Sequence, residues 1–226
     1  MKLPGAAPRA RPSRWNQLLK HALARLLPRR WFLVRGPADG KAVCLTFDDG
    51  PHPEHTPRLL DVLKQQNVTA TFFVIGEQAD RHPQLVRRIA AEGHAIGHHT
   101  YRHTRPDATT ARQLGAEVQQ TRALLADILG APCNLFRPPL GKLTVRKLWK
   151  LWRQRQTVVL WNRSPDDGAG LPAAELSRWF TDNPLHGGDV VLLHDDQPTT
   201  VAALPEIVAT ARRQGVKFVT LPEWTR

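Results

Sequence analysis

Short apolar runs alternate with longer amphipathic segments from Lys41 to the end of the chain. Strands buried on both faces of a parallel sheet are continuously apolar, whereas helices that cover the sheet carry an apolar stripe at helical spacing. The pattern predicts strands at 42–47, 70–75, 95–97, 135–137, 158–161, 190–194 and 218–221. It predicts helices at 57–66, 84–92, 110–129, 144–153, 172–182 and 200–214. This alternation is typical of an α/β fold with about seven βα units.

The first 40 residues have a different character, because they carry no acidic residue before Asp39 and are rich in lysine and arginine. We assign 1–40 to a basic, helical arm and 41–226 to a single folded domain. In the arm, helical spacing relates the apolar positions 15, 18, 19, 22, 23, 26 and 27, and basic residues fill the other face. Such a helix suits either packing on the domain or contact of residues 1–36 with an anionic lipid surface.

The formal net charge is +12, and much of the excess lies in the arm. No helix-turn-helix, zinc-finger or aromatic RNA-binding pattern accompanies it, so we expect no nucleic-acid partner. Basic residues interrupt the leucines of the arm, so we expect neither an export signal nor a membrane-spanning segment. We therefore expect a cytoplasmic protein that lies peripherally at the inner face of the membrane. The two cysteines, Cys44 and Cys133, are expected to be buried free thiols.

Polar residues cluster where the predicted strands end. Parallel α/β folds build their sites at this edge of the sheet, so these residues are candidates for one site. They are Asp48, Asp49, His99, Arg137, Asp166, Asp167 and His194.

Asp49, His99 and His103 form the candidate metal site. Histidines four residues apart on a helical turn point to the same side and can hold one ion together with a carboxylate. Two imidazoles and one carboxylate leave positions open, which is typical of a catalytic divalent site. Zinc is the expected ion, and cobalt, nickel and manganese also suit these ligands. His94 and His98 share the spacing, but we expect them to be surface or strand-capping residues.

Four ordered motifs resemble those of the polysaccharide deacetylase family of NodB-like carbohydrate esterases. The resemblance runs from about Lys41 to Trp224 and implies a distorted (β/α)7 barrel that hydrolyses N-acetyl groups on sugars with a metal ion. The motifs are Thr46-Phe47-Asp48-Asp49-Gly50-Pro51, His99-Thr100-x-x-His103, Arg137-Pro138-Pro139-Leu140-Gly141 and Leu192-Leu193-His194.

The resemblance also implies a role for each site residue. Asp48 would be the general base and Asp49 the metal ligand, which explains the adjacent carboxylates. Arg137 would orient Asp48 and keep it ionised, and His194 would be the general acid.

Three further residues complete the site that the resemblance implies. The backbone N–H of Leu140 would stabilise the oxyanion, and Leu192 would contact the acyl methyl group. Asp167, with Asp166 as the alternative, would tune His194. Many family members carry an aromatic residue at the position of Leu140 and a Trp after the Asp aligned with Asp167, so we expect an altered sugar contact and a more open pocket or a different acyl group.

The sequence therefore predicts a metal-dependent N-deacetylase that acts on an N-acetylhexosamine of a saccharide or a lipid-linked saccharide. Two other hypotheses remain open at this point. One is a deformylase or O-deacetylase on a sugar-lipid intermediate. The other is a non-catalytic module that binds a glycan or a lipid, although such a module needs no base, acid and metal ligands together.

Overall fold

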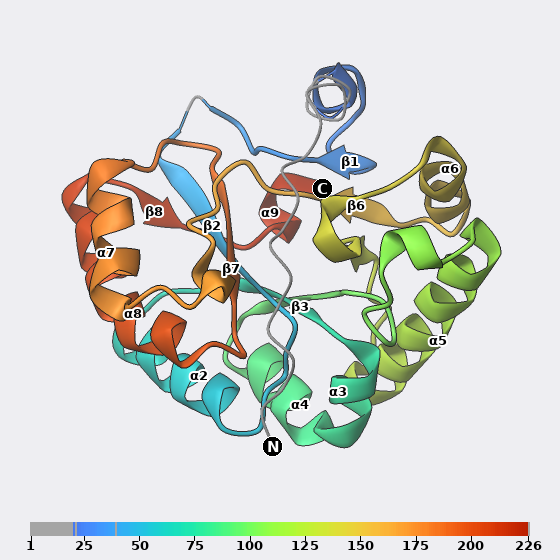
Figure 1. Cartoon of the computed structure of the whole chain (residues 1–226), viewed down its shortest axis with the longest axis horizontal. Coiled ribbons are helices and arrows are strands. Elements are labelled where there is room, and N and C mark those ends of the chain that lie inside the picture. Colours follow the sequence, from blue (N-terminus) through green and yellow to red (C-terminus); the bar gives the residue numbers. More distant parts are fainter. Residues whose placement is uncertain (1–19, 21, 39, 226) are drawn as a thin grey trace.

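The structure is a computed structural model that describes residues 20, 22–38 and 40–225. Seven parallel strands follow one another in the sheet order β1-β6-β5-β4-β3-β2-β7 and curl into a half-barrel, and β8 pairs with β2 (Figure 1). The strands are β1 (Phe32–Leu33), β2 (Ala42–Asp48), β3 (Thr71–Val74), β4 (Ala95–His98), β5 (Leu135–Phe136), β6 (Thr157–Val159), β7 (Val190–His194) and β8 (Lys217–Phe218). The expected α/β barrel is confirmed, in the form of a half-barrel.

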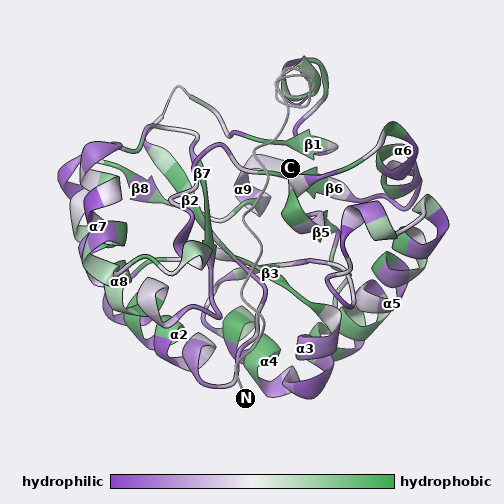
Figure 2. Cartoon of the chain, viewed as in Figure 1, coloured by the Kyte–Doolittle hydropathy of each residue, from purple (hydrophilic) through white to green (hydrophobic). Residues whose placement is uncertain are grey.

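Helices form an outer layer around the sheet, and Figure 2 shows mostly hydrophobic strands inside and mostly hydrophilic outer helix faces. The helices are α2 (His55–Gln65), α3 (Gly76–Arg81), α4 (Pro83–Ala91), α5 (Ala111–Leu129), α6 (Val145–Arg153), α7 (Ala173–Asp182), α8 (Pro198–Arg213) and α9 (Pro222–Thr225). Short 3-10 turns are η1 (Pro106–Ala108), η2 (Pro139–Gly141) and η3 (Asp167–Ala169). No helix in the described part of the chain is long and apolar enough to cross a bilayer.

Local sequence signals set the bounds of the longest helix. At its N-terminus Thr110 accepts the N–H of Gln113, whose side chain accepts the N–H of Thr110, which forms a capping box. At its C-terminus Gly130 adopts a left-handed conformation with φ of 67°. The largest core cluster lies between the sheet and the helices, where Phe47 of β2 packs on Phe72 of β3 with ring centroids 5.1 Å apart. This packing fixes the strand ends that carry the polar residues.

The arm contributes one strand that the sequence pattern did not predict. β1 pairs with β6 in the register Phe32 with Val158 and Leu33 with Val159. A strand of only two residues, directly after a run of arginines, gives no clear periodicity. The division of the chain at residue 40 stays a prediction, since β1 joins the arm to the sheet.

Part of the predicted arm helix is also described. Residues 20 and 22–26 are helical, and Leu23, Ala24 and Leu27 pack against the core cluster that contains Phe32. Leu23, Ala24 and Leu27 therefore pack on the domain, which was one of the two alternatives for the arm. The positions of the predicted helix before residue 20 lie outside the described residues. Both cysteines are buried free thiols, as expected.

Candidate metal centre and active site

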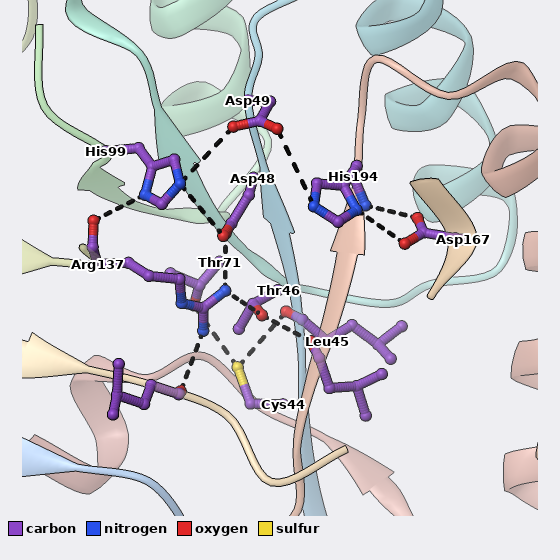
Figure 3. Close-up of polar contacts among 12 residues, drawn as sticks. Cys44, Leu45, Thr46, Asp48, Asp49, Thr71, His99, Arg137, Asp167 and His194 are labelled. Carbon is purple, nitrogen blue, oxygen red and sulfur yellow. Dashed lines mark hydrogen bonds and ion pairs between the residues drawn. The ribbon is translucent and has the colours of Figure 1, made fainter. Parts of the chain in front are cut away.

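The site begins at the end of β2, where alternation along the strand turns Thr46 and Asp48 to the same face. β2 pairs with β7 so that Asp48 lies opposite His194, and β4, which is separated from β2 by β3, ends just before His99. Asp49 follows β2 with φ of 77°, a left-handed conformation that turns the chain at once. The parallel strands thus bring the carboxylates and both histidines to one edge of the sheet (Figure 3).

Asp49, His99 and His103 come together as a group whose possible ligand atoms all lie within 4.8 Å of one another. Asp49 Oδ1 is 3.4 Å from His103 Nε2 and 3.7 Å from His99 Nε2. Two ligands at about 2.0–2.1 Å from a tetrahedral ion lie about 3.4 Å apart, so this spacing fits one divalent cation.

The predicted helical turn between the two histidines is wrong. Both lie in the loop after β4, where Thr100 and His103 adopt left-handed φ angles of 68° and 52°. The Thr100 hydroxyl accepts the N–H of His103 at 3.0 Å and stabilises this loop. The loop brings the rings within 4.8 Å of each other, centroid to centroid.

The tautomer of His99 follows from its backbone contact. Its Nδ1 lies 2.7 Å from the carbonyl oxygen of Arg137, which can only accept, so Nδ1 carries the proton. Nε2 then presents its lone pair toward Asp49, as a metal ligand requires. Burial lowers the pKa of His99, against the opposing effect of Asp48 and Asp49, and this favours the neutral ring that can bind a metal.

His94 and His98 are not among the candidate metal ligands. Of the two alternatives expected for them, the surface position is wrong. Both are buried. His94 Nδ1 accepts the N–H of Ala70 at 3.2 Å just before β3, whereas His98 Nε2 lies 2.8 Å from Gln156 Oε1.

Arg137 is completely buried and forms an ion pair with Asp48. Its Nη1 lies 2.7 Å from Asp48 Oδ1 and donates to the Thr46 hydroxyl at 2.7 Å, while Nη2 donates to the carbonyl of Leu160 at 3.3 Å. The guanidinium also stacks on the Phe73 ring at 4.1 Å. Burial lowers the pKa of Arg137, but an arginine stays charged, and its cation pairs with the carboxylate of Asp48.

Asp167, and not Asp166, is the carboxylate that contacts His194. Asp167 Oδ1 lies 2.7 Å from His194 Nδ1, and Oδ2 accepts the backbone N–H of His194 and the hydroxyl of Thr200. Asp166 instead is exposed, with φ of 55°, and its Oδ1 accepts the hydroxyl of Ser164 at 3.5 Å. Asp167 is fully buried, so its orientation is fixed.

The protonation of His194 depends on this carboxylate. Burial by itself lowers the pKa of His194, but the hydrogen bond and charge of Asp167, with smaller contributions from Asp49 and Asp48, raise it to about 9. His194 Nε2 lies 4.0 Å from Asp49 Oδ2 and faces the candidate metal ligands. The imidazole is therefore charged at neutral pH and is placed to donate a proton into the site.

Leu140 and Leu192 flank the site in different ways. Leu140 lies in η2 with φ of 55° and is 37% exposed, whereas Leu192 is buried in β7 on the same face as His194. Beside Leu140, a Cβ atom on Gly141 would lie 2.8 Å from the Trp161 ring, so Gly141 allows this ring to pack closely against the loop.

Sequence reasoning missed three residues at the site, Thr46, Thr200 and Lys20. Thr46, two positions before Asp48 on the strand, could have been found from alternation, but nothing in the sequence indicated Thr200 as a partner of Asp167. Lys20 of the arm reaches the backbone carbonyl of Trp161, and its Nζ lies 5.4 Å from the centre of the Trp161 ring. Burial and the charge of Arg137 lower the pKa of Lys20 to about 8.

Residues 35–157 match the family model described as polysaccharide deacetylase. The chain belongs to the polysaccharide deacetylase family. The resemblance inferred from the four motifs is confirmed.

Three relatives show how similar this chain is to known deacetylases in sequence and in structure. A peptidoglycan-N-acetylglucosamine deacetylase of Bacillus cereus is 37% identical over 195 residues, which cover 84% of this chain and 70% of the relative. The peptidoglycan-N-acetylmuramic acid deacetylase PdaA of Bacillus subtilis is 32% identical, with 83% of this chain and 73% of the relative covered. A crystal structure of a peptidoglycan N-acetylglucosamine deacetylase in complex with an N-oxidanyl-benzamide superimposes with a TM-score of 0.82 at 35% identity, covering 86% of this chain and 92% of the other.

The family membership, the fold and the three converging ligands have one functional consequence. The chain is a metal-dependent carbohydrate deacetylase that acts on an amide bond.

We predict that His103→Ala weakens metal binding by about 10–100-fold or more. Loss of a residue that only supports a ligand already costs metal sites about 10–100-fold in affinity. His103 is partly exposed, so the fold tolerates the change, and the matched control is His186→Ala, an exposed histidine outside the site. Titration calorimetry with zinc and with cobalt measures both proteins. Unchanged affinity in His103→Ala would exclude this residue as a ligand.

Proposed function

We propose that this chain removes the acetyl group from N-acetylglucosamine residues of peptidoglycan, with zinc as its metal. The observation that carries the proposal is the arrangement of two proton-transfer groups around the candidate ligands. Asp48 Oδ2 lies 3.7 Å from His99 Nε2, and His194 Nε2 lies 4.0 Å from Asp49 Oδ2. A base and an acid that both face one metal position suit hydrolysis of an amide.

Asp48 is the proposed general base. A divalent cation held by Asp49, His99 and His103 would supply Lewis-acid chemistry that favours ionisation of water and offsets charge on the acetyl oxygen. Asp48, paired with Arg137 through Oδ1, accepts the proton of the attacking water. Because Arg137 holds only Oδ1 of Asp48, Oδ2 faces the site and is the oxygen available for this transfer.

His194 is the proposed general acid. The leaving amine is a poor leaving group unless its nitrogen is protonated as the carbon–nitrogen bond breaks. Asp167 holds Nδ1 of His194 and raises the pKa of the ring, so that Nε2 carries a proton near neutral pH. Asp167 thus acts through His194 and does not contact the substrate.

Leu140 and Leu192 are the proposed substrate contacts. The left-handed conformation of Leu140 puts a backbone N–H on an exposed turn, where it can donate to the oxyanion. Leu192 contributes an apolar surface near His194 for the acyl methyl group. Gly168 follows Asp167 where family members commonly carry a Trp, so we expect a more open pocket or a different acyl group.

The glycan itself is proposed from the relatives. Two of the three described above act, by name, on peptidoglycan N-acetylglucosamine and one on peptidoglycan N-acetylmuramic acid. An N-acetylglucosamine unit occurs both in the polymer and in a lipid-linked saccharide, and the basic arm favours a substrate near a membrane. The proposed place of action is the cytoplasmic side, at the inner face of the membrane, with residues 1–36 as part of the contact, and there the N-acetylglucosamine unit would belong to a lipid-linked saccharide and not to the assembled polymer.

We predict that Asp48→Asn lowers kcat for acetate release from peptidoglycan about 10²–10⁴-fold, because the amide cannot accept the proton of the water. The amide oxygen can still accept from Arg137, so the fold and the metal affinity should stay close to the original. Acetate, formate and free amine are measured after zinc, cobalt, nickel or manganese is restored to metal-stripped protein. N-acetylglucosamine oligomers, lipid-linked N-acetylglucosamine, an N-formylated sugar and O-acetylated sugars serve as parallel substrates. Release of formate alone, or action on O-acetyl groups alone, would contradict the proposal.

We predict that Asp167→Asn moves the alkaline limb of the pH–rate profile to lower pH. His194 acts in its protonated form, so the rate is highest below its pKa and falls as pH rises through about 9. Without the Asp167 charge the pKa of His194 drops and the fall starts nearer neutrality. The matched control is Asp166→Asn, whose profile should coincide with that of the unchanged protein. A profile of Asp167→Asn that keeps its alkaline limb would show that Asp167 does not set this pKa.

Membrane association through the arm requires a deletion that keeps the fold. Removal of residues 1–36 would also remove β1, so removal of 1–19 is the suitable change. We predict that cells expressing the shortened chain contain less of it in the membrane fraction than cells expressing the full chain. Equal fractions, with acetate release unchanged in both, would exclude residues 1–19 as the membrane contact.

A further inference from the structure

The exposed hydrophobic side chains of the described residues are concentrated in two segments. Among the described residues, the large hydrophobic side chains that are exposed are Leu26, Trp31, Leu140, Val145 and Trp149. Leu140 belongs to the active site. The other four lie in the arm and on α6, with Leu26 79% and Val145 73% exposed. Scattered apolar residues at a surface need no explanation, but a patch that gathers them indicates a binding surface.

The arm and α6 are joined by direct contacts. Trp31 packs against Trp152 of α6 with ring centroids 5.9 Å apart, and Trp152 Nε1 donates to the carbonyl of Trp31 at 3.0 Å. On α6, Val145 and Trp149 lie one turn apart on the same side, and Trp152 is three residues beyond Trp149. The helix at residues 22–26, β1 and α6 lie toward the same edge of the molecule (Figure 1). We name Leu26, Trp31, Val145 and Trp149, with the arginines between them, the arm–α6 surface.

The charges of this surface all have one sign. No acidic residue occurs before Asp39, and none occurs between Asp127 and Asp166. Four exposed arginines lie in the same two segments as the apolar side chains; they are Arg29, Arg30, Arg146 and Arg153. None of these arginines forms an ion pair with a described residue. Arg153 stacks on Trp149 at 4.7 Å, so its cation lies at the edge of an exposed aromatic ring.

We infer that the arm–α6 surface docks on an anionic lipid bilayer. Tryptophan prefers the boundary between headgroups and acyl chains, where leucine and valine reach the apolar layer and arginine binds phosphate. A second copy of this chain fits poorly, because a two-fold contact of this face with itself would bring arginines against arginines. The inference concerns a surface outside the catalytic residues and stands apart from the identity of the glycan.

Docking by this surface would hold the active site next to the membrane. The turn η2, which carries Leu140, leads into α6 through only three residues, 142–144. Lys20, from the same helix as Leu26, contacts Trp161 beside that turn. A saccharide held close to the bilayer would therefore reach the site without detachment of the protein.

Vesicle sedimentation with the full chain tests the inference. The vesicles contain phosphatidylcholine with or without phosphatidylglycerol. One variant combines Arg146→Gln and Arg153→Gln, and a second combines Val145→Ser and Trp149→Ser. The matched control combines Lys64→Gln and Arg87→Gln, two exposed cations on α2 and α4 that remove the same charge elsewhere.

We expect the full chain to bind only the vesicles that contain phosphatidylglycerol. The Arg146 and Arg153 variant should bind about 25-fold more weakly, from about fivefold for each cation at an anionic surface, and the control should change little. The Val145 and Trp149 variant should bind about tenfold more weakly and should lose part of the fluorescence quenching that brominated lipids cause. Acetate release from a soluble N-acetylglucosamine oligomer should be the same in all four proteins, so failure of the surface and failure of the proposed chemistry are separable.

Two results would overturn the inference. Equal vesicle binding by the α6 variants and the control would show that α6 takes no part in any membrane contact. Dimers of the full chain that the α6 variants abolish, without vesicle binding, would assign the surface to a second copy.

Discussion

The ion pair of Arg137 and Asp48 is the contact on which the site depends. Arg137 lies in the interior, where an unpaired charge costs several kcal/mol, so the guanidinium needs the carboxylate of Asp48 as its partner. Its Nη1 and Nη2 connect β2 with the residue that follows β6. Its backbone N–H donates to the carbonyl of His98, and its backbone carbonyl accepts the Nδ1 proton of His99. One residue therefore positions the proposed base and sets the tautomer of a metal ligand. A change at Arg137 would affect stability, metal affinity and rate together, so these effects could not be separated there.

The two adjacent carboxylates at the end of β2 avoid mutual repulsion because opposite charges hold them in different places. Asp48 turns inward to Arg137 along the strand, and the left-handed turn at Asp49 directs the second carboxylate toward His99 and His103. His194 adds a further cation near Asp49. Arg137 and His194 thus face the two carboxylates, and a divalent ion held by Asp49, His99 and His103 would add further positive charge on the side of the histidines. Adjacent aspartates are consistent with the metal chemistry for this electrostatic reason, beyond the similarity of the motif.

The sequence predicted those parts of the fold and site in which local pattern and chemistry agree. Parallel strands at apolar runs placed Asp48, His99, Arg137 and His194 at one edge, and the structure brings them together there. The reason given for the His99 and His103 pair was wrong, because the left-handed residues of a loop, and not helical spacing, bring them together. β1 was missed because two residues carry too little periodicity. Thr200 could not be found because its contact with Asp167 depends on how α8 packs over η3.

Catalytic and surface charges operate in this protein under different physical conditions. Arg137, Asp167 and His194 are buried, so their interactions are strong and depend on fractions of an ångström. The arginines of the arm and α6 are exposed, and salt screens their fields over about 8–10 Å. Substitutions on that surface should therefore change where the protein lies and leave the pKa of His194 unchanged. β1 and η2 connect the two regions along the chain, so the proposed docking would orient the active site toward a charged layer without exposing the buried ion pair to it.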